Sequence, residues 1–221
     1  MGMKDKIFGA SKNEGSTEQK GFYEDVKARR SIYGIGKERV ISDEKLQEVI
    51  EYAVKHTPSA FNSQSARIVV LLDDHHNKLW NEITKETLRA IVPPDQFEAT
   101  EGRMNGFASG YGTVLFFEDQ NVIKGLQEKL PTFADNFPKW SQHSSGMLQF
   151  VIWTALEKEG LGASLQHYNP LIDDQVKEEW KLPESWELIA QMPFGNPTAP
   201  PGEKEFKPIE ERVKFYPTLK V

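Results

Sequence analysis

Cysteine is absent from this sequence of 221 residues. Its absence excludes disulfide bonds, thiolate catalysis and cysteine-ligated zinc or iron–sulfur centres. No apolar run approaches the roughly 18 residues of a membrane-spanning helix, and the first residues lack the apolar core of a signal peptide. The formal net charge of -6 leaves no excess of Lys and Arg for phosphate backbones. We therefore expect a soluble, cytoplasmic protein that binds neither nucleic acid nor membrane.

The remaining composition is typical of a globular chain, with 38% hydrophobic and 27% charged residues. Residues 1–19 have little apolar content and are expected to form a flexible tail. Residues 20–199 carry the periodic patterns of a folded domain. The extension 200–221 looks extended and cannot form a core of its own, so it either stays loose or packs on another subunit.

Apolar periodicity predicts an α+β fold in which helices surround four or five short strands. The strongest pattern lies at 43–56, where Ser42 is a good N-cap and apolar residues recur at helical spacing from Leu46 to Val54. Other helices are predicted at about 21–29, 76–92, 95–107, 121–129, 140–159 and 173–181. Strands are predicted at 67–72, 113–117, 161–167 and 186–192.

Several of these predictions concern burial. The near-continuous apolar strand 67–72 is expected to be buried on both faces. Glu118 and Asp119 are expected to close the strand that precedes them. In the predicted helix 76–92 the inward residues would be Leu79, Ile83, Leu88 and Ile91. The helix 140–159 should be central and buried, with inward residues Met147, Leu148, Val151, Ile152 and Ala155.

The loop from Pro58 to Gln64 is the first candidate for a binding site. Pro58 ends the preceding helix because proline lacks an amide donor. The loop then offers Ser59, Asn62 and Gln64, whose hydroxyl and amide groups can hydrogen-bond the edge of a flat heteroaromatic ring. The alternative is an ordinary helix–strand connection in which the same side chains make local turns.

Two further segments offer binding groups. Arg29, Arg30 and Ser31 follow the first predicted helix, and paired arginines suit a phosphate as well as they suit a solvated helix end. Residues 160–170 contain Gln166 and His167 at the end of a short predicted strand. A histidine there can be a structural hydrogen-bonding residue or a catalyst.

Other motifs are weaker. His75 and His76 are adjacent on a predicted helix, point in different directions and lack a third ligand, so no metal site is predicted. Ser144 lacks the glycine that a nucleophile elbow requires. The aromatic segment 133–140 either lines a flat ligand pocket or forms part of a subunit interface.

Taken in order, these segments resemble the FMN-dependent nitroreductase family. They are Arg29-Arg30-Ser31, Pro58 to Gln64, Glu159 to Gly162, the turn Phe194 to Pro197 and a basic C-terminal segment. The resemblance covers about residues 21–216. It is closest to the fatty-acid-repression-mutant-like subgroup, through residues 160–170 and 204–213.

The resemblance implies a homodimer with one FMN per subunit in the interface. It also implies ping-pong hydride transfer, from NADH or NADPH to the flavin and then to a nitroaromatic or quinone-like acceptor. Residues 20–199 would form the nitroreductase-like domain, and the extension 200–221 would pack on the partner subunit.

The resemblance also assigns roles. Arg29, Arg30 and Ser31 would bind the FMN phosphate and ribityl chain, and Lys204 would reach the phosphate from the C-terminal segment. Ser59, Asn62 and Gln64, from the same or the partner subunit, would lie against the ring. The backbone at Gln166, His167 and Tyr168 would face the flavin N5. No side-chain acid or base is required, so no catalytic residue is assigned.

Two departures from the family pattern lie in the cationic positions. Tyr33 stands where the family often has a basic residue, and Phe206 takes the third place of a usual Lys-x-Arg. Arg212 is the substitute we expect, and the Tyr33 hydroxyl can still hydrogen-bond. The alternatives to an oxidoreductase are a flavin-binding regulatory or stress-response protein with little turnover, and an interaction module that uses its aromatic loop.

Overall fold

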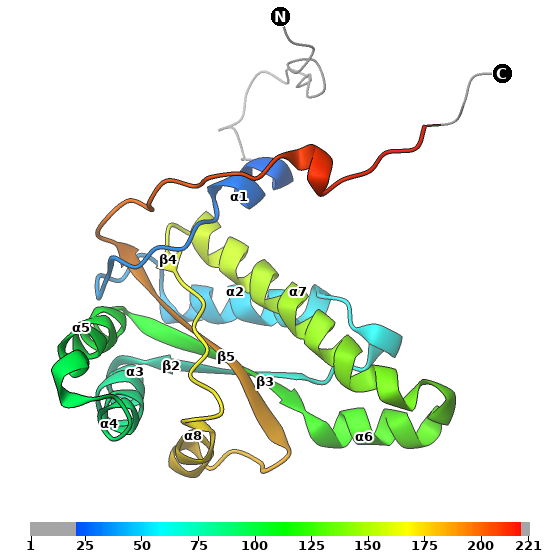
Figure 1. Cartoon of the computed structure of the whole chain (residues 1–221), viewed down its shortest axis with the longest axis horizontal. Coiled ribbons are helices and arrows are strands. Elements are labelled where there is room, and N and C mark those ends of the chain that lie inside the picture. Colours follow the sequence, from blue (N-terminus) through cyan, green and yellow to red (C-terminus); the bar gives the residue numbers. More distant parts are fainter. Residues whose placement is uncertain (1–20, 218–221) are drawn as a thin grey trace, which may run out of the picture.

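The computed structural model describes residues 21–217, so the predicted tail 1–19 lies outside the described residues. Its centre is a five-stranded sheet in which every pairing between strands is antiparallel (Figure 1). The order is β1-β5-β3-β2, and β4 pairs with β5 at Phe194 and Gly195. The strands are β1 (Ile35–Gly36), β2 (Ala66–Leu72), β3 (Gly112–Asp119), β4 (Gly162–Ala163) and β5 (Trp186–Pro197). The α+β prediction is thus confirmed.

Helices cover both faces of this sheet (Figure 1). The α-helices are α1 (Phe22–Ala28), α2 (Asp43–His56), α3 (Asp73–Lys78), α4 (Lys85–Arg89), α5 (Phe97–Ala108), α6 (Gln120–Lys129), α7 (Phe137–Lys158) and α8 (Asp173–Trp180). A π-helical turn at Leu79–Thr84 joins α3 to α4, and 3₁₀ turns occupy Ala60–Asn62, Pro94–Gln96, Pro131–Asn136 and Ile209–Glu211.

The helix α2 has the predicted bounds for the predicted reasons. The Ser42 Oγ accepts a hydrogen bond from the Lys45 amide at 3.2 Å, and Asp43 and Glu44 place negative charge in the first turn. The helix ends at His56, two residues before Pro58, because proline disfavours a helical residue before it.

Alternate residues of β3 serve two separate cores. Val114 and Phe116 pack against α2 and α7, which we call the α2/α7 face. Leu115 and Phe117 pack against α3, α4, α5 and α8, which we call the α5/α8 face. Since strand side chains alternate, one strand supplies both cores.

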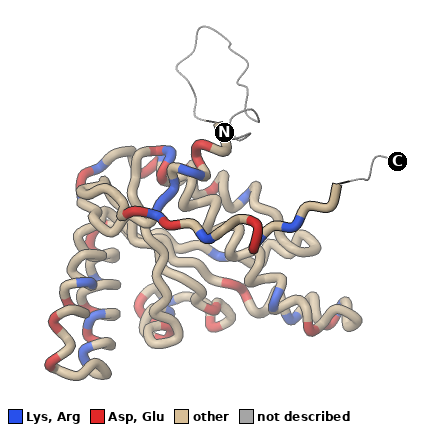
Figure 2. Tube along the Cα trace, turned by 45° about the horizontal axis from the view of Figure 1, so that its top comes forward, with Lys and Arg blue, Asp and Glu red and all other residues tan. Residues whose placement is uncertain are grey.

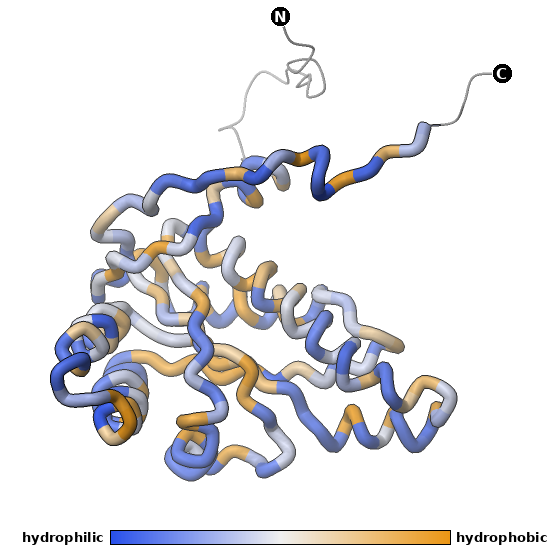
Figure 3. The backbone as a smooth tube through the Cα atoms, viewed as in Figure 1, coloured by the Kyte–Doolittle hydropathy of each residue, from blue (hydrophilic) through white to orange (hydrophobic). Residues whose placement is uncertain are grey.

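Some burial predictions were wrong. In β2 only Leu71 is buried, because β2 is an edge strand. Ile91 is 58% exposed, since the helix ends at Arg89. On α7, Met147 is 42% and Val151 37% exposed, so part of the apolar surface of this helix is not covered by the described chain. Figure 3 shows that hydrophobic and hydrophilic residues are interspersed along it.

Strand bounds also differ from prediction. The β4 pairing stops at Ala163, and Gln166 makes only an isolated bridge to Gln191. In contrast, β3 continues to Asp119, with Glu118 fully buried rather than closing the strand.

The segment from Pro200 to Pro217 leaves the body as an exposed, mostly extended chain. Acidic and basic residues are interspersed along it (Figure 2), and exposed apolar residues lie among them or follow them, namely Phe206, Ile209, Val213, Phe215 and Tyr216. An extended segment was predicted and is confirmed. Its packing on a partner subunit remains a prediction.

Candidate functional site

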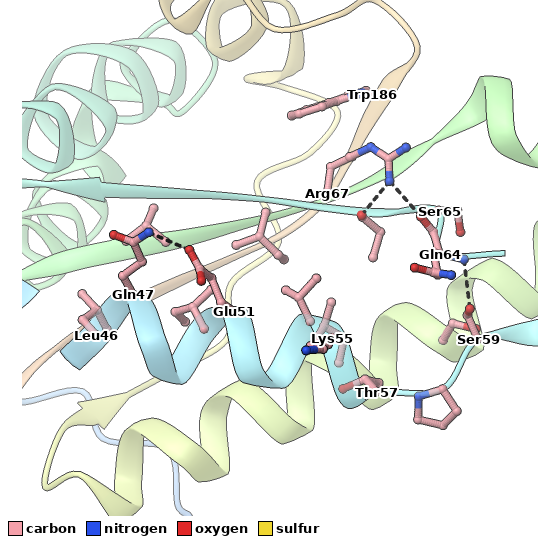
Figure 4. Close-up of a pocket in the computed structure, with 18 of the residues that line it drawn as sticks. Leu46, Gln47, Glu51, Lys55, Thr57, Ser59, Gln64, Ser65, Arg67 and Trp186 are labelled. Carbon is pink, nitrogen blue, oxygen red and sulfur yellow. Dashed lines mark hydrogen bonds between the residues drawn. The ribbon is translucent and has the colours of Figure 1, made fainter. Parts of the chain in front are cut away.

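A groove of about 820 Å³ lies between α2 and the edge strand β2 (Figure 4). Leu46, Ile50 and Val54 form the α2 wall, and Ile68 and Val70 form the β2 wall. At one end it reaches the loop 58–65 through Ser59, Gln64 and Ser65. Gln47, Glu51 and Lys55 of α2 also line it, so the groove has apolar walls, charged and amide side chains along α2 and a polar end at the loop.

The loop itself holds a strained backbone without glycine. Phe61, Asn62 and Gln64 have φ of 54°, 50° and 49°. A non-glycine residue in this left-handed region costs about 1–2 kcal/mol. Such strain clusters at functional sites, where the surroundings enforce it.

Local hydrogen bonds enforce this conformation. The Ser59 Oγ accepts from the Gln64 amide at 3.0 Å, and the Ser59 carbonyl accepts from the Asn62 amide at 2.9 Å. Arg67 donates to the Gln64 carbonyl at 2.8 Å and pairs with Asp119 at 3.0 Å (Figure 4). Asn62 and Gln64 remain exposed, so their amide groups are available to a ligand.

An aromatic cluster stands beside the loop. The Phe61 ring is 56% exposed and stacks on Trp140 with centroids 5.8 Å apart and planes at 25°. Phe133 and Phe137 complete the cluster, each within 6.0 Å of the Phe61 ring centroid. The predicted aromatic segment thus lies next to the predicted ring-binding loop.

The arginine pair lies at the other end of α7. The Arg29 guanidinium carbon is 4.3 Å from the centre of the Trp153 ring, and its Nε has no hydrogen-bond partner among residues 21–217. Burial, followed by the neighbouring charge of Arg30, lowers the pKa of Arg29, while Glu157 raises it. Arginine nevertheless stays charged in proteins. A half-buried cation with unused donors favours an anionic ligand.

The segment after β4 runs beside this arginine end. Ser31 bridges Ala163, and the Ile32 amide donates to the Ala163 carbonyl at 2.9 Å. The Gln166 amide donates to the Gln191 carbonyl at 2.7 Å, and the Tyr168 amide donates to the Gln191 side chain at 2.7 Å. Both amides are engaged, so the exposed His167 is the one of the three whose amide is left for a ligand.

The other predicted site residues lie on the surface. Tyr33 is 64% exposed, and Lys204 lies 5.1 Å from the Phe206 ring on the C-terminal segment. Arg212 follows the last 3₁₀ turn. Within residues 21–217, no hydrogen bond or ion pair joins Lys204 or Arg212 to Arg29. Arg30 does reach this segment, donating to the Gly202 carbonyl at 2.5 Å.

The predicted site residues therefore form two groups rather than one. The loop 58–65 contacts the start of α7 near Trp140, and Arg29 contacts the same helix at Trp153. A helix rises 1.5 Å per residue, so these positions are about 20 Å apart along α7. One chain presents two half-sites at the two ends of its central helix.

Two contributors were missed by the sequence reasoning. Trp153 gave no signal beyond its place on a predicted helix. Glu118 gave one, as an acidic residue directly after the four apolar residues 114–117 of β3. Its pKa is raised to about 7, first of all by burial.

The histidine pair does not act as a unit. The His76 Nδ1 lies 2.8 Å from the buried Thr113 Oγ1, whereas His75 accepts from the Trp180 Nε1 at 3.2 Å. In the described part of the chain, no three acidic, His or Cys side chains are grouped as metal ligands. No helix there is long and apolar enough to cross a membrane.

Comparisons with known proteins give a consistent set of matches. The model of the nitroreductase family matches residues 26–196. HBN1 of Saccharomyces cerevisiae is 41% identical over 192 residues, covering 86% of this chain and 93% of HBN1. The nitroreductase FRM2 of the same yeast is 34% identical over 180 residues, covering 80% of this chain and 89% of FRM2.

Solved structures agree with these matches. Nitroreductase CinD from Lactococcus lactis, in complex with chloramphenicol, is 45% identical with a TM-score of 0.82, covering 89% of this chain and 100% of CinD. CinD has also been solved with 4-nitrophenol and with nicotinic acid. A protein from Exiguobacterium sibiricum in complex with FMN shares the fold at 17% identity and a TM-score of 0.65.

Proposed function

Because the chain belongs to the nitroreductase family and is similar to FRM2, we propose that it is an FMN-dependent oxidoreductase of nitroaromatic or quinone-like acceptors. NADH or NADPH would supply the hydride in a separate half-reaction, giving a ping-pong mechanism. The resemblance drawn from the sequence segments is confirmed at the level of the family and its fold.

The residues present fit a flavin mononucleotide. The observation that carries the proposal is the half-buried Arg29, whose Nε has no partner and whose guanidinium is held against Trp153 beside Ser31. Arg29, Arg30 and Ser31 would bind the phosphate and ribityl chain. The bound flavin would supply hydride acceptance and donation, which no side chain of this protein can perform.

The loop would serve the ring. Ser59, Asn62 and Gln64 would hydrogen-bond its polar edge, and the backbone at Gln166 and His167 would face the N5, with the His167 amide as donor. The strain at Asn62 and Gln64 supports this role, because it keeps both amide groups in one fixed arrangement before the ligand arrives. Lys204 and Arg212 would add charge near the phosphate, and the Tyr33 hydroxyl would add a hydrogen bond.

The two half-sites support a homodimer. They lie about 20 Å apart along α7, so the loop of one subunit would meet the arginine end of the other. The exposed apolar residues Met147, Phe150 and Val151 lie along α7 between the two groups, and a second copy would bury them. Each flavin would then be held by residues of both subunits.

The extension 200–221 would complete this dimer. The outer edge of β2 is unpaired within the described residues, and the apolar groove beside it has no occupant from the same chain. Val213 and Phe215 are 57% and 84% exposed at the end of the described segment. We propose that this segment of one subunit lies in the α2/β2 groove of the other.

The aromatic cluster would receive the acceptor. A ring that stacks on Phe61 or Trp140 would lie beside the loop that holds the flavin ring, which brings donor and acceptor together. CinD has been solved with 4-nitrophenol and chloramphenicol, both nitroaromatic compounds, which supports this class of acceptor.

The experiment that tests the proposal follows the colour of the purified protein. We expect a yellow protein whose flavin is bleached by NADH or NADPH without oxygen and recoloured by 4-nitrophenol. Protein that stays colourless after FMN is added would contradict the proposal. Bound flavin that neither nucleotide bleaches in a stopped-flow instrument would favour a regulatory flavoprotein instead.

A further inference from the structure

A fully buried carboxyl group lies beneath the loop 58–65. Glu118 is 0% exposed, and neither of its carboxylate oxygens has a hydrogen-bond partner in the described part of the chain. In the ladder it faces Ala66 of β2, so its side chain lies on the α2/α7 face, as those of Val114 and Phe116 do. A buried acid without partners is costly in its charged form.

The charged and polar groups around Glu118 do not offset the effect of burial on its pKa. Burial raises its pKa to about 7, and the Ser65 hydroxyl and the charge of Arg67 lower it only in part. Glu187 on β5 and Asp119 on its own strand raise it further. None of the buried side chains that α7 packs against this face is charged. The carboxyl group is therefore neutral in mildly acid solution and becomes charged slightly above neutral pH.

Backbone and hydroxyl contacts connect this position to the loop. Ser65 is 1% exposed, and its carbonyl accepts from the Asp119 amide at 2.9 Å, directly after Glu118. Its hydroxyl lies 3.5 Å from that of Ser63 inside the loop. Ser65 also follows Gln64, the last of the three left-handed residues of the loop.

We propose that Glu118 is a positioning residue whose neutral carboxyl group holds Ser65, and through it the strained loop 58–65, in the conformation that binds the flavin ring. The proposal rests on the function given above, because the flavin is the ligand of this loop. The described structure shows no hydrogen bond from Glu118, but the Ser65 hydroxyl is close enough to lower its pKa. A neutral carboxyl group that turns toward Ser65 can donate its proton to this hydroxyl. The charged form cannot donate, and it must recruit water or move, which disturbs Ser65.

The test measures riboflavin binding to the flavin-free protein by fluorescence quenching at about pH 6 and about pH 8.5. Riboflavin lacks the phosphate, so phosphate ionisation does not contribute to the pH dependence. For the wild type we expect the Kd to rise about tenfold between the two pH values, because charging Glu118 opposes the binding conformation. Glu118→Gln keeps the shape without the charge and should hold the Kd within about twofold.

The matched control is Glu128→Gln, which removes an exposed glutamate of α6 that is not among the groups that shift the pKa of Glu118. It should show the same rise in Kd as the wild type.

Ser65→Ala should remove most of the rise in Kd, because the effect of Glu118 passes through this residue. Amide hydrogen exchange of residues 58–65 gives a readout without flavin. At the higher pH the wild-type loop should exchange faster, after correction for intrinsic rates, and the Glu118→Gln loop should not.

The outcomes separate this inference from the proposed function. An equal pH-dependent rise in Glu118→Gln and the wild type overturns the positioning role and leaves the flavin site intact. A rise that Ser65→Ala retains in full also overturns it. Absence of both riboflavin and FMN binding in the wild type at either pH overturns the proposed function and this inference together.

Discussion

The two faces of the sheet differ in how completely this chain covers them. On the α5/α8 face the large apolar residues are buried, and the buried polar side chains His76, Trp80 and Thr113 bond one another. Within the described residues, the buried polar atoms without a hydrogen-bond partner in the elements that cover this face are the His76 Nε2 and single oxygens of Thr84 and Asp173. On the α2/α7 face the core is equally well packed at Phe116, but around it lie an open groove, a strained loop and the unpartnered Glu118.

This difference separates stability from function. A face that one chain completes needs nothing else to fold, and its strand and helix residues follow ordinary packing rules. A face with exposed apolar residues and an open groove marks where other molecules bind. The α5/α8 face therefore serves as the scaffold, and the α2/α7 face carries the proposed flavin and dimer contacts.

Removal of the extension 200–221 should have the largest effect on the contacts proposed for the α2/α7 face. In the proposed dimer the extension of one subunit fills the groove between α2 and β2 of the other. Deletion from Pro200 onward would leave this groove empty and expose both of its walls. We expect aggregated or flavin-free protein by size-exclusion chromatography with light scattering and absorbance. As a control, deletion of only 218–221 should keep the dimer and its flavin. A stable monomer that retains FMN after the longer deletion would contradict the proposed packing.

On the α5/α8 face, protonation of His76 should lower the stability of the protein in acid. Burial lowers its pKa from 6.5 to about 4, so the unfolded chain takes up a proton before the folded protein does. Stability from the neutral, buried ring is complete above pH 6.5 and is lost as the pH falls to about 4. This shift corresponds to about 3 kcal/mol.

His76→Asn provides the measurement, because asparagine has no charge to gain. The free energy of unfolding of the wild type, minus that of His76→Asn, should rise by about 3 kcal/mol between pH 4 and 6.5 in urea titrations. The corresponding difference for Glu118→Gln should have the opposite sign. It should fall between pH 4.5 and about 7, because a raised carboxyl pKa makes the folded state hold its proton longer. Two difference curves of the same sign would refute these assignments.

Arg29→Ala should weaken FMN about thirtyfold, the loss of one charge-assisted pair with a phosphate. Riboflavin, which lacks the phosphate, should bind the variant almost as it binds the wild type. Equilibrium fluorescence titrations with both ligands measure the two effects. Lys27→Ala removes an exposed cation from the same helix end and is the matched control. Equal losses for FMN and riboflavin would show that Arg29 supports the fold at Trp153 rather than the phosphate.

The same division explains which elements the sequence could predict. The bounds of α2 follow from Ser42 and Pro58, which act within a few residues, and the alternation in β3 follows from its own side chains. In contrast, the partial exposure of β2 and of Met147 and Val151 could not be predicted, since apolar patterns do not tell which surface covers them. Those residues belong to the proposed contacts with a second copy.

The candidate site was predictable to a similar extent. The resemblance singled out Arg29, Ser31 and the loop residues, because these side chains stand at fixed places in the sequence motifs. The stacking of Arg29 on Trp153 and the burial of Glu118 depend on contacts between distant segments. A strand ending in Phe-Phe-Glu-Asp is ordinarily interpreted as closing at its first charge, and here tertiary packing continues it to Asp119.

The smallest expected effect is the change in stability when backbone strain is relieved at one position on each face. Lys181 ends α8 with φ of 51° and ψ of 45°, a left-handed position that glycine occupies without steric cost. Lys181→Gly should therefore raise the free energy of unfolding by about 1 kcal/mol and leave flavin affinity unchanged.

Gln64, with φ of 49°, has the same kind of strain in the loop. Gln64→Gly should relieve it by a similar amount while weakening riboflavin binding, because the freed loop loses both the amide group and its fixed shape. Urea unfolding and riboflavin titration of the two variants give the comparison directly. The contrary result is that Gln64→Gly equals Lys181→Gly, with the same gain in stability and the same affinity for riboflavin. In that case the strain in the loop would have no part in binding, and the two faces would differ only in how much apolar surface they expose.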